Sequence, residues 1–168
     1  EKGKLMKKIS NILSTLLLIV VVILACIFFV PRLFGIQTMA VLSGSMEPHF
    51  HVGSLVFVKD AEITDFEKDD IVTFKIGNGD TVVTHRVTQV TKEGLKTKGD
   101  ANHSEDGGLV TSANLVGKAF SFSIPVLGYL AVYMSSQTGI ILLIGAIILV
   151  FVLSYIGSLF DKKEKGAN

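Results

Sequence analysis

The segment 71–88 reads IVTFKIGNGDTVVTHRVT, and it decides the fold of the domain around it. Its two halves are rich in β-branched and aromatic residues, which favour β-strands. Between them stands Gly77-Asn78-Gly79-Asp80, and glycine and asparagine accept the positive φ angles of a tight turn. The pattern therefore predicts an antiparallel hairpin.

Further strands are predicted on both sides of this hairpin. Residues 54–58 form a short apolar run, and residues 115–124 form a longer one with Phe120 and Phe122 on one face. No amphipathic helix and no internal repeat is recognised in residues 41–124. The predicted fold class is therefore mostly β, with one small antiparallel β domain.

Two long apolar runs flank this domain, and they raise the apolar content to 49% and the mean hydropathy to +0.54. No charged residue lies between Lys8 and Arg32, or between Lys118 and Asp161. A helix that crosses a bilayer needs about 20 such residues. We therefore expect the β domain to be anchored by an N-terminal and a C-terminal transmembrane helix.

The two expected helices divide the chain into five segments. A cleaved signal peptide is the alternative for the first run, but the run is long and Pro31-Arg32-Leu33-Phe34 is a poor cleavage site. A buried core helix is the alternative for the second run, and its length argues against it. The segments are a basic N-terminus at 1–8, a transmembrane helix at 9–30, the β domain with its linkers at 31–137, a second transmembrane helix at 138–160 and a basic tail at 161–168.

The basic flanks of the two runs predict an orientation. Lysine and arginine are enriched on the cytoplasmic side of membrane helices. Both ends are therefore expected in the cytoplasm, with the β domain outside a cell membrane that the chain crosses twice. The lysines that support this orientation are Lys2, Lys4, Lys7, Lys8, Lys162, Lys163 and Lys165.

The remaining composition excludes several function classes. The net charge is +1 and no basic patch is interleaved with aromatic residues, so no nucleic-acid partner is expected. The single cysteine, Cys26, lies in the first apolar run, so the β domain is expected to fold without disulfides. His49 and His51 form an HxH pair, but no further ligand set completes a metal site, so we expect neither a metal nor another cofactor.

The segment VLSGSMEP at 41–48 has the pattern of a loop that presents a nucleophile. Gly44 allows a sharp turn, and Pro48 favours an extended backbone at Glu47. The loop is therefore expected to expose Ser45. Ser-Gly-Ser is also common in flexible linkers, although the apolar residues around it make that alternative weaker.

A serine hydroxyl needs a base and, in a triad, an acid that orients the base. In the predicted strand His85 lies between Val83 and Val87 on one face, where partial desolvation favours the neutral imidazole. A hydrogen-bonded structural histidine is the alternative. The loop KGDANHSEDG at 98–107 offers three carboxylates, any of which could be an exposed turn acid: Asp100, Glu105 and Asp106.

Together these segments resemble type I signal peptidases. Residues 43–48 match the nucleophile box of that family, and residues 84–87 match the box that carries its base. Residues 68–74 resemble the Gly-Asp-Ile-Val strand of the family, and residues 98–102 resemble its Gly-Asp-Asn-Asn box. Histidine as the base and a C-terminal membrane segment are similar to the SipW type and to the branch of archaea and the endoplasmic reticulum. The sequence departs from the family pattern at Asp69, where glycine is usual, and at Ala101, where asparagine is usual.

The resemblance implies a membrane-bound serine endopeptidase with Ser45 as the nucleophile and His85 as the general base. Asp106 is the first choice for the orienting acid and Asp100 the second, and Glu105 is not supported. The backbone N–H of Ser45 and the hydroxyl of Ser43 would form the oxyanion hole. No substrate-binding residue is assigned.

The resemblance also implies the substrates and partners. Signal peptides of secreted preproteins would bind as an extended strand at a sheet edge and be cut at the outer membrane–water interface. The lipid bilayer is a second expected partner, and the secretion translocon is a further candidate.

Several alternatives stay open. The chain could be a Ser-Lys protease of the same superfamily, with Lys75, Lys96 or Lys98 as the base. It could also be a non-catalytic membrane-tethered β scaffold, or an inactive relative that partners an active protease. Met46 is expected either to contact lipid or to pack inside the domain.

Overall fold

The computed structural model describes residues 2–77, 79, 81–134 and 136–165. These residues form two compact units, which we describe separately. One unit is residues 31–132. The other combines the described parts of residues 1–30 and 133–168.

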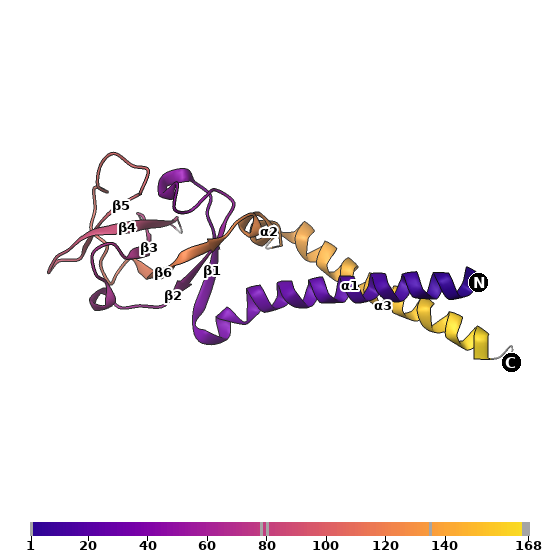
Figure 1. The fold of residues 1–168 in the computed structure, drawn as a ribbon. Helices are drawn as coiled ribbons and strands as arrows, with labels where there is room; N and C mark the ends of the chain where they lie inside the picture. The colour runs from indigo at the N-terminus through magenta and orange to yellow at the C-terminus, as the bar shows by residue number, and fades with distance from the viewer. Residues whose placement is uncertain (1, 78, 80, 135, 166–168) are drawn as a thin grey trace. The chain divides into compact units, whose positions relative to one another are not determined.

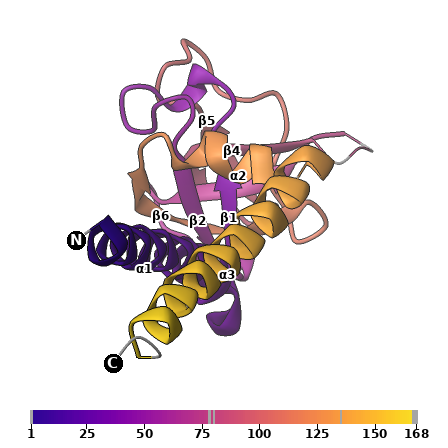
Figure 2. The ribbon, with the colours of Figure 1, turned by 90° about the vertical axis from the view of Figure 1, so that its right-hand side faces the viewer.

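Within the described residues of the first unit, six strands form one antiparallel sheet in the order β1-β2-β6-β3-β4-β5 (Figure 1). The last strand in the sequence is therefore central, because β6 pairs with both β2 and β3. Figure 2 shows β1, β2 and β6 next to one another. The strands are β1 (Ile36–Ala40), β2 (Leu55–Lys59), β3 (Ile71–Lys75), β4 (Val82–Val90), β5 (Leu95–Lys98) and β6 (Leu115–Ile124).

The predicted hairpin is confirmed. β3 and β4 pair antiparallel, with Ile71 opposite Arg86 and Lys75 opposite Val82. The predicted strands at 54–58 and 115–124 correspond to β2 and β6. Asn78 and Asp80 of the predicted turn lie outside the described residues.

Sequence analysis did not predict β1, β5 or the short helix α2 (Leu127–Met134), which follows β6. α2 lies close to the start of β2, because the N–H of Gly128 donates to the carbonyl of Gly53 at 2.9 Å. A Cβ on Gly128 would lie 2.2 Å from the carbonyl oxygen of Ser54, so only glycine allows this approach.

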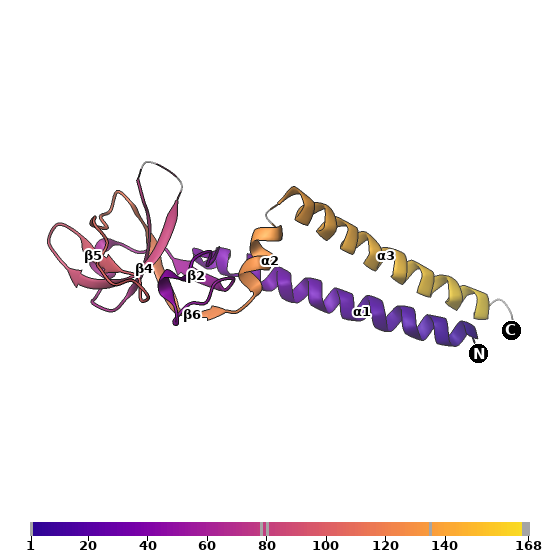
Figure 3. The same cartoon turned by 90° about the horizontal axis from the view of Figure 1, so that it is seen from above.

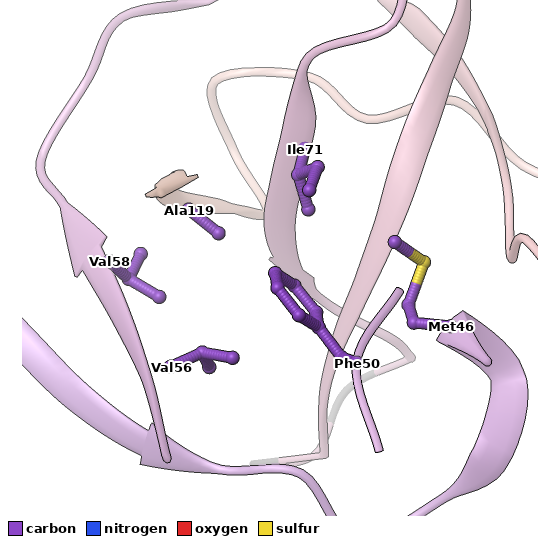
Figure 4. Packing of buried hydrophobic residues seen from close by; sticks show 6 residues of the cluster. All are labelled: Met46, Phe50, Val56, Val58, Ile71 and Ala119. Carbon is purple, nitrogen blue, oxygen red and sulfur yellow. The ribbon is translucent and has the colours of Figure 1, made fainter. Parts of the chain in front are cut away.

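Two clusters of buried side chains form the core of this unit. The first surrounds Phe50, which is fully buried (Figure 4). Met46 belongs to this cluster and is only 2% exposed, so the alternative in which it contacts lipid is wrong. The clusters are Met46, Phe50, Val56, Val58, Ile71 and Ala119, and Phe66, Val72, Phe74, Val87, Leu95 and Val110.

The second unit contains two long helices, α1 (Lys2–Phe29) and α3 (Gln137–Lys165), which lie side by side (Figure 3). Each contributes most or all of a segment long and apolar enough to cross a membrane, and almost none of the side chains in those segments is buried. That exposure contradicts the alternative of a buried core helix for the second run. The side chain of Ser10 links the helices by donating to the carbonyl of Leu153 at 2.8 Å.

Candidate active site

Ser45 lies in one turn of 3-10 helix, η2 (Gly44–Met46), in the connection between β1 and β2. The turn is closed by the N–H of Glu47, which donates to the carbonyl of Gly44 at 3.0 Å, and it is anchored by the buried side chain of Met46. As predicted, Glu47 is extended, with φ −62° and ψ 144°. The Ser-Gly-Ser segment is therefore a packed turn, not a linker.

The backbone of Ser45 is held by the loop that follows β5. The N–H of Ala101 donates to the carbonyl of Ser45 at 2.9 Å. A Cβ on Gly99 would lie 2.6 Å from that same carbonyl oxygen, so the loop can approach it only because residue 99 is glycine. The loop and the serine turn are thus built against each other.

His85 lies on β4, which contacts the serine turn η2. The residue is buried, at 6% exposed, and the ring of Phe74 lies edge-on to the imidazole with 6.1 Å between centroids. Nδ1 of His85 lies 2.7 Å from Oδ2 of Asp106. The carboxylate therefore favours the tautomer that carries its proton on Nδ1 and leaves Nε2 as an acceptor.

Asp106 is fixed by a second residue, Thr97 on β5. The Thr97 hydroxyl donates to Oδ2 of Asp106 at 2.6 Å, and the Asp106 N–H donates to the Thr97 carbonyl at 2.8 Å. Two donors, the imidazole and the hydroxyl, thus converge on one carboxylate oxygen.

Asp100 lies against Arg86, not against His85. Nε of Arg86 donates to Oδ1 of Asp100 at 2.8 Å, and Nη2 donates to Oδ2 at 2.7 Å. These hydrogen bonds lower the pKa of Asp100 from its usual value, and their effect exceeds that of partial burial, which raises it. The same carboxylate raises the pKa of Arg86. Such a bidentate pair fixes the start of the loop that holds Ser45.

The structure does not join every predicted site residue. Among the described residues, Oγ of Ser45 has a hydrogen-bond contact with Oγ of Ser43 at 3.4 Å, and none links it to His85. Hydrogen bonds of a catalytic serine are often long in unliganded enzymes. Oγ of Ser43, an expected oxyanion donor, lies beside Oγ of Ser45, the expected nucleophile.

Other candidates have different partners. Glu105 accepts from the hydroxyl of Thr88 at 2.7 Å, and Nζ of Lys98 donates to the carbonyl of Asn102 at 3.0 Å. Nδ1 of His51 pairs with Oε2 of Glu47, and the N–H of Val52 donates to Oε1 of the same carboxylate at 3.3 Å. Within the described part of the chain, no group of three histidine, cysteine or acidic residues could hold a metal ion.

Comparison with known proteins decides the family. Residues 12–96 match the family described as "Signal peptidase, peptidase S26". Signal peptidase I W of Bacillus subtilis is 36% identical over 132 residues, which are 71% of this chain and 69% of that protein. The chain belongs to the signal peptidases of family S26.

Two more distant relatives are catalytic subunits of signal peptidase complexes. SEC11 of Schizophyllum commune is 34% identical over 122 residues, covering 56% of this chain and 63% of that protein. SEC11C of Homo sapiens is 35% identical over 107 residues, covering 56% of this chain and 55% of that protein. The family and these relatives make this chain a serine-type signal peptidase.

The structure explains one departure of this signal peptidase from the family pattern. Asp69, where glycine is usual, has a φ of 75°. That left-handed conformation is readily adopted by glycine and tolerated by aspartate. The substitution therefore keeps the backbone conformation that the position requires.

Sequence reasoning missed two residues of this signal peptidase that hold the site together. Arg86 enters the sequence pattern only within the segment 84–87, and Thr97 carries no signal in the sequence. The sequence around Arg86 or Thr97 does not reveal its partner, because each side chain forms its hydrogen bond with a residue of the loop that follows β5.

Proposed function

We propose that this signal peptidase removes signal peptides from secreted preproteins with Ser45 as nucleophile, His85 as general base and Asp106 as orienting acid. The observation that carries the assignment is the 2.7 Å contact between Nδ1 of His85 and Oδ2 of Asp106. Ser45 belongs to the segment that matches the nucleophile box, and its turn contacts the strand of His85. Asp100, the second choice for the acid, is engaged with Arg86.

In the proposed reaction, Oγ of Ser45 attacks the carbonyl carbon at the end of the signal peptide while Nε2 of His85 takes its proton. The imidazolium, stabilised by Asp106, then protonates the leaving amine. Water, activated by the same imidazole, hydrolyses the acyl-enzyme. The N–H of Ser45 and the hydroxyl of Ser43 stabilise the negative oxygen of each tetrahedral intermediate.

We further propose that the substrate pairs as an extended strand with β1. β1 and β5 are the edges of the sheet among the described residues, and β1 is the edge strand that leads directly into the serine turn. Small pockets along such an edge would select small side chains, typically alanine, one and three residues before the cut.

The proposed location is a cell membrane crossed at residues 9–30 and 138–160, with residues 1–8 and 161–168 in the cytoplasm. Two helices of suitable length and composition support the spans, and the lysine clusters support the orientation. Residues 31–44 reach at most about 50 Å when extended, so Ser45 would work near the outer membrane surface. Signal peptides, lipid and the secretion translocon would be the partners there.

The test is cleavage of a preprotein with an alanine-type site, co-expressed with the full chain and followed by gel shift. We expect wild type to produce mature protein and both Ser45→Ala and His85→Ala to lose cleavage by more than about 1,000-fold. Ser104→Ala and His103→Ala are matched controls, because both residues are exposed in the loop before Asp106. These controls should cleave like wild type.

Two results would overturn the proposal. Cleavage by Ser45→Ala above background would rule out Ser45 as the nucleophile and the mechanism built on it. Retained cleavage by His85→Ala, together with its loss on replacing Lys75, Lys96 or Lys98 by methionine, would favour a Ser-Lys protease.

A further inference from the structure

Thr97 is bonded to Asp106 through both its side chain and its backbone. The hydroxyl donates to Oδ2 at 2.6 Å, and the carbonyl accepts from the Asp106 N–H at 2.8 Å. Thr97 is fully buried, with 0% exposure. Its position is therefore fixed by packing, and it can hold a loop residue that is itself less constrained.

The placement of Thr97 follows from the sheet register. Thr97 on β5 lies opposite Val87 on β4. Alternation along β4 puts Val87 and His85 on the same face, so β5 brings the Thr97 hydroxyl to the side of the sheet where the imidazole lies. Both groups then reach the same oxygen of Asp106.

The two bonds constrain the carboxylate in different ways. A carboxylate oxygen has two lone pairs and can accept from the imidazole and the hydroxyl together. The side chain of Asp106 is 23% exposed and comes from a loop, so a single contact with His85 would leave it able to rotate. The second contact, from a rigid strand, restricts that rotation.

We propose that Thr97 is a positioning residue for catalysis, whose hydroxyl holds the Asp106 carboxylate in the orientation that His85 requires. This inference rests on the roles proposed above for His85 and Asp106. Thr97 acts through Asp106, so its loss affects the proton-transfer steps and leaves the binding of the substrate peptide unchanged. The effect therefore falls on kcat and not on KM.

The experiment compares three variants of the full chain, purified in detergent and assayed on a peptide with an alanine-type cleavage site. Thr97→Ser and Thr97→Ala lose the same methyl group and differ only in the hydroxyl, and Thr97→Val keeps the shape without the hydroxyl. We expect Thr97→Ala and Thr97→Val to lower kcat by about 10-fold to 100-fold at unchanged KM. Thr97→Ser should stay within about threefold of wild type.

Thr73→Val is the matched control for loss of a buried hydroxyl. Thr73 is also 0% exposed, and its hydroxyl bonds to that of Thr84 at 2.9 Å, not to Asp106. We expect this variant to lose thermal stability much as Thr97→Val does, while its kcat stays near that of wild type. A purely structural role for Thr97 would instead make the two threonines behave alike.

Three outcomes would overturn the inference. These are equal kcat values for Thr97→Ser and Thr97→Ala, an equal fall of kcat in Thr73→Val, and a change that appears in KM alone. The first comparison decides even if Thr97→Val does not fold. Retained activity of Ser45→Ala or His85→Ala in this assay would mean that the proposed function, and not only the role of Thr97, has failed.

Discussion

Asp69 occupies a left-handed backbone conformation because both of its backbone groups are bound by β4. Its N–H donates to the carbonyl of Val87 at 2.9 Å, and its carbonyl accepts from Nη1 of Arg86 at 2.8 Å. These two hydrogen bonds to β4 therefore hold Asp69 at a φ of 75°. A side chain at this position has to tolerate that conformation, whatever it contacts.

This requirement predicts how substitutions at Asp69 affect stability. Asp69→Gly should unfold at the same temperature as wild type or higher, because glycine adopts positive φ without steric cost. Asp69→Val should lower the free energy of unfolding by about 1–2 kcal/mol. Thermal and urea denaturation would measure both, with the exposed neighbour Lys68→Val as the control. Equal destabilisation by glycine and valine would contradict the argument.

At the scale of elements, the loop after β5 is fastened to the sheet by side-chain contacts with both β4 and β5. Arg86 and Thr88 project from β4 to Asp100 and Glu105, and Thr97 of β5 holds Asp106. The loop in turn supports the carbonyl of Ser45 through Ala101. The proposed nucleophile, base and acid therefore depend on one loop being correctly closed.

The ion pair at the start of this loop predicts a pH dependence of stability. The folded state lowers the pKa of Asp100 below its usual value of about 3.9, so the pair stabilises the fold fully above that pH. This contribution is lost as the pH falls through the folded-state pKa. The difference in Tm between wild type and Asp100→Asn should therefore be largest above about pH 4 and shrink in more acidic solution.

Denaturation curves between pH 7 and pH 2 would check this dependence. Asp60→Asn is the control, because among the described residues the Asp60 carboxylate accepts only an exposed hydrogen bond from Gln37, at 3.3 Å. A Tm difference for Asp100→Asn that stays constant over the whole range would show that the ion pair is not responsible.

The sequence predicted the elements whose residues carry a clear period and missed those that do not. The β3–β4 hairpin, β2 and β6 have β-branched or apolar runs of sufficient length, whereas β5 has four residues, two of them lysine. α2 is apolar throughout and merges with the second long run in the sequence. Short strands and uniformly apolar helices depend on tertiary contacts that no local pattern records.

In the candidate site, too, some residues could be predicted from the sequence and others could not. The alternation of residues along β4 indicated His85 as a candidate base. The turn residues around Ser45 indicated that serine as a candidate nucleophile. Asp100 and Asp106 lie in one polar loop and look alike as sequence, so only the path of that loop over β4 separates the partner of Arg86 from the partner of His85. Thr97 gave no signal, because a threonine in a short strand is ordinary.

At the scale of the whole molecule, the two units differ in how far their apolar side chains are exposed to solvent. The β unit buries its apolar side chains in two clusters, while the long helices leave theirs exposed. Exposed apolar surface on this scale requires a non-aqueous environment or a partner. The proposal that α1 and α3 span a bilayer supplies that environment.

The proposed topology can be tested by cysteine labelling, because the chain has one native cysteine, Cys26. In a Cys26→Ala background, Ser104→Cys in the β unit should react with a membrane-impermeant maleimide on intact cells. Lys163→Cys should react only after the cells are permeabilised. Labelling of Lys163→Cys in intact cells would reverse the orientation or remove the second span.

The central place of β6 has a consequence for how the enzyme matures. β2 and β3 do not pair directly among the described strands, and each is joined to the sheet through β6. β2, which follows the serine turn, and the β3–β4 hairpin are therefore not joined in one sheet until residues 115–124 pair with both β2 and β3. We therefore expect the complete sheet, and with it the proposed catalytic arrangement, to form only after residues 115–124 have been synthesised.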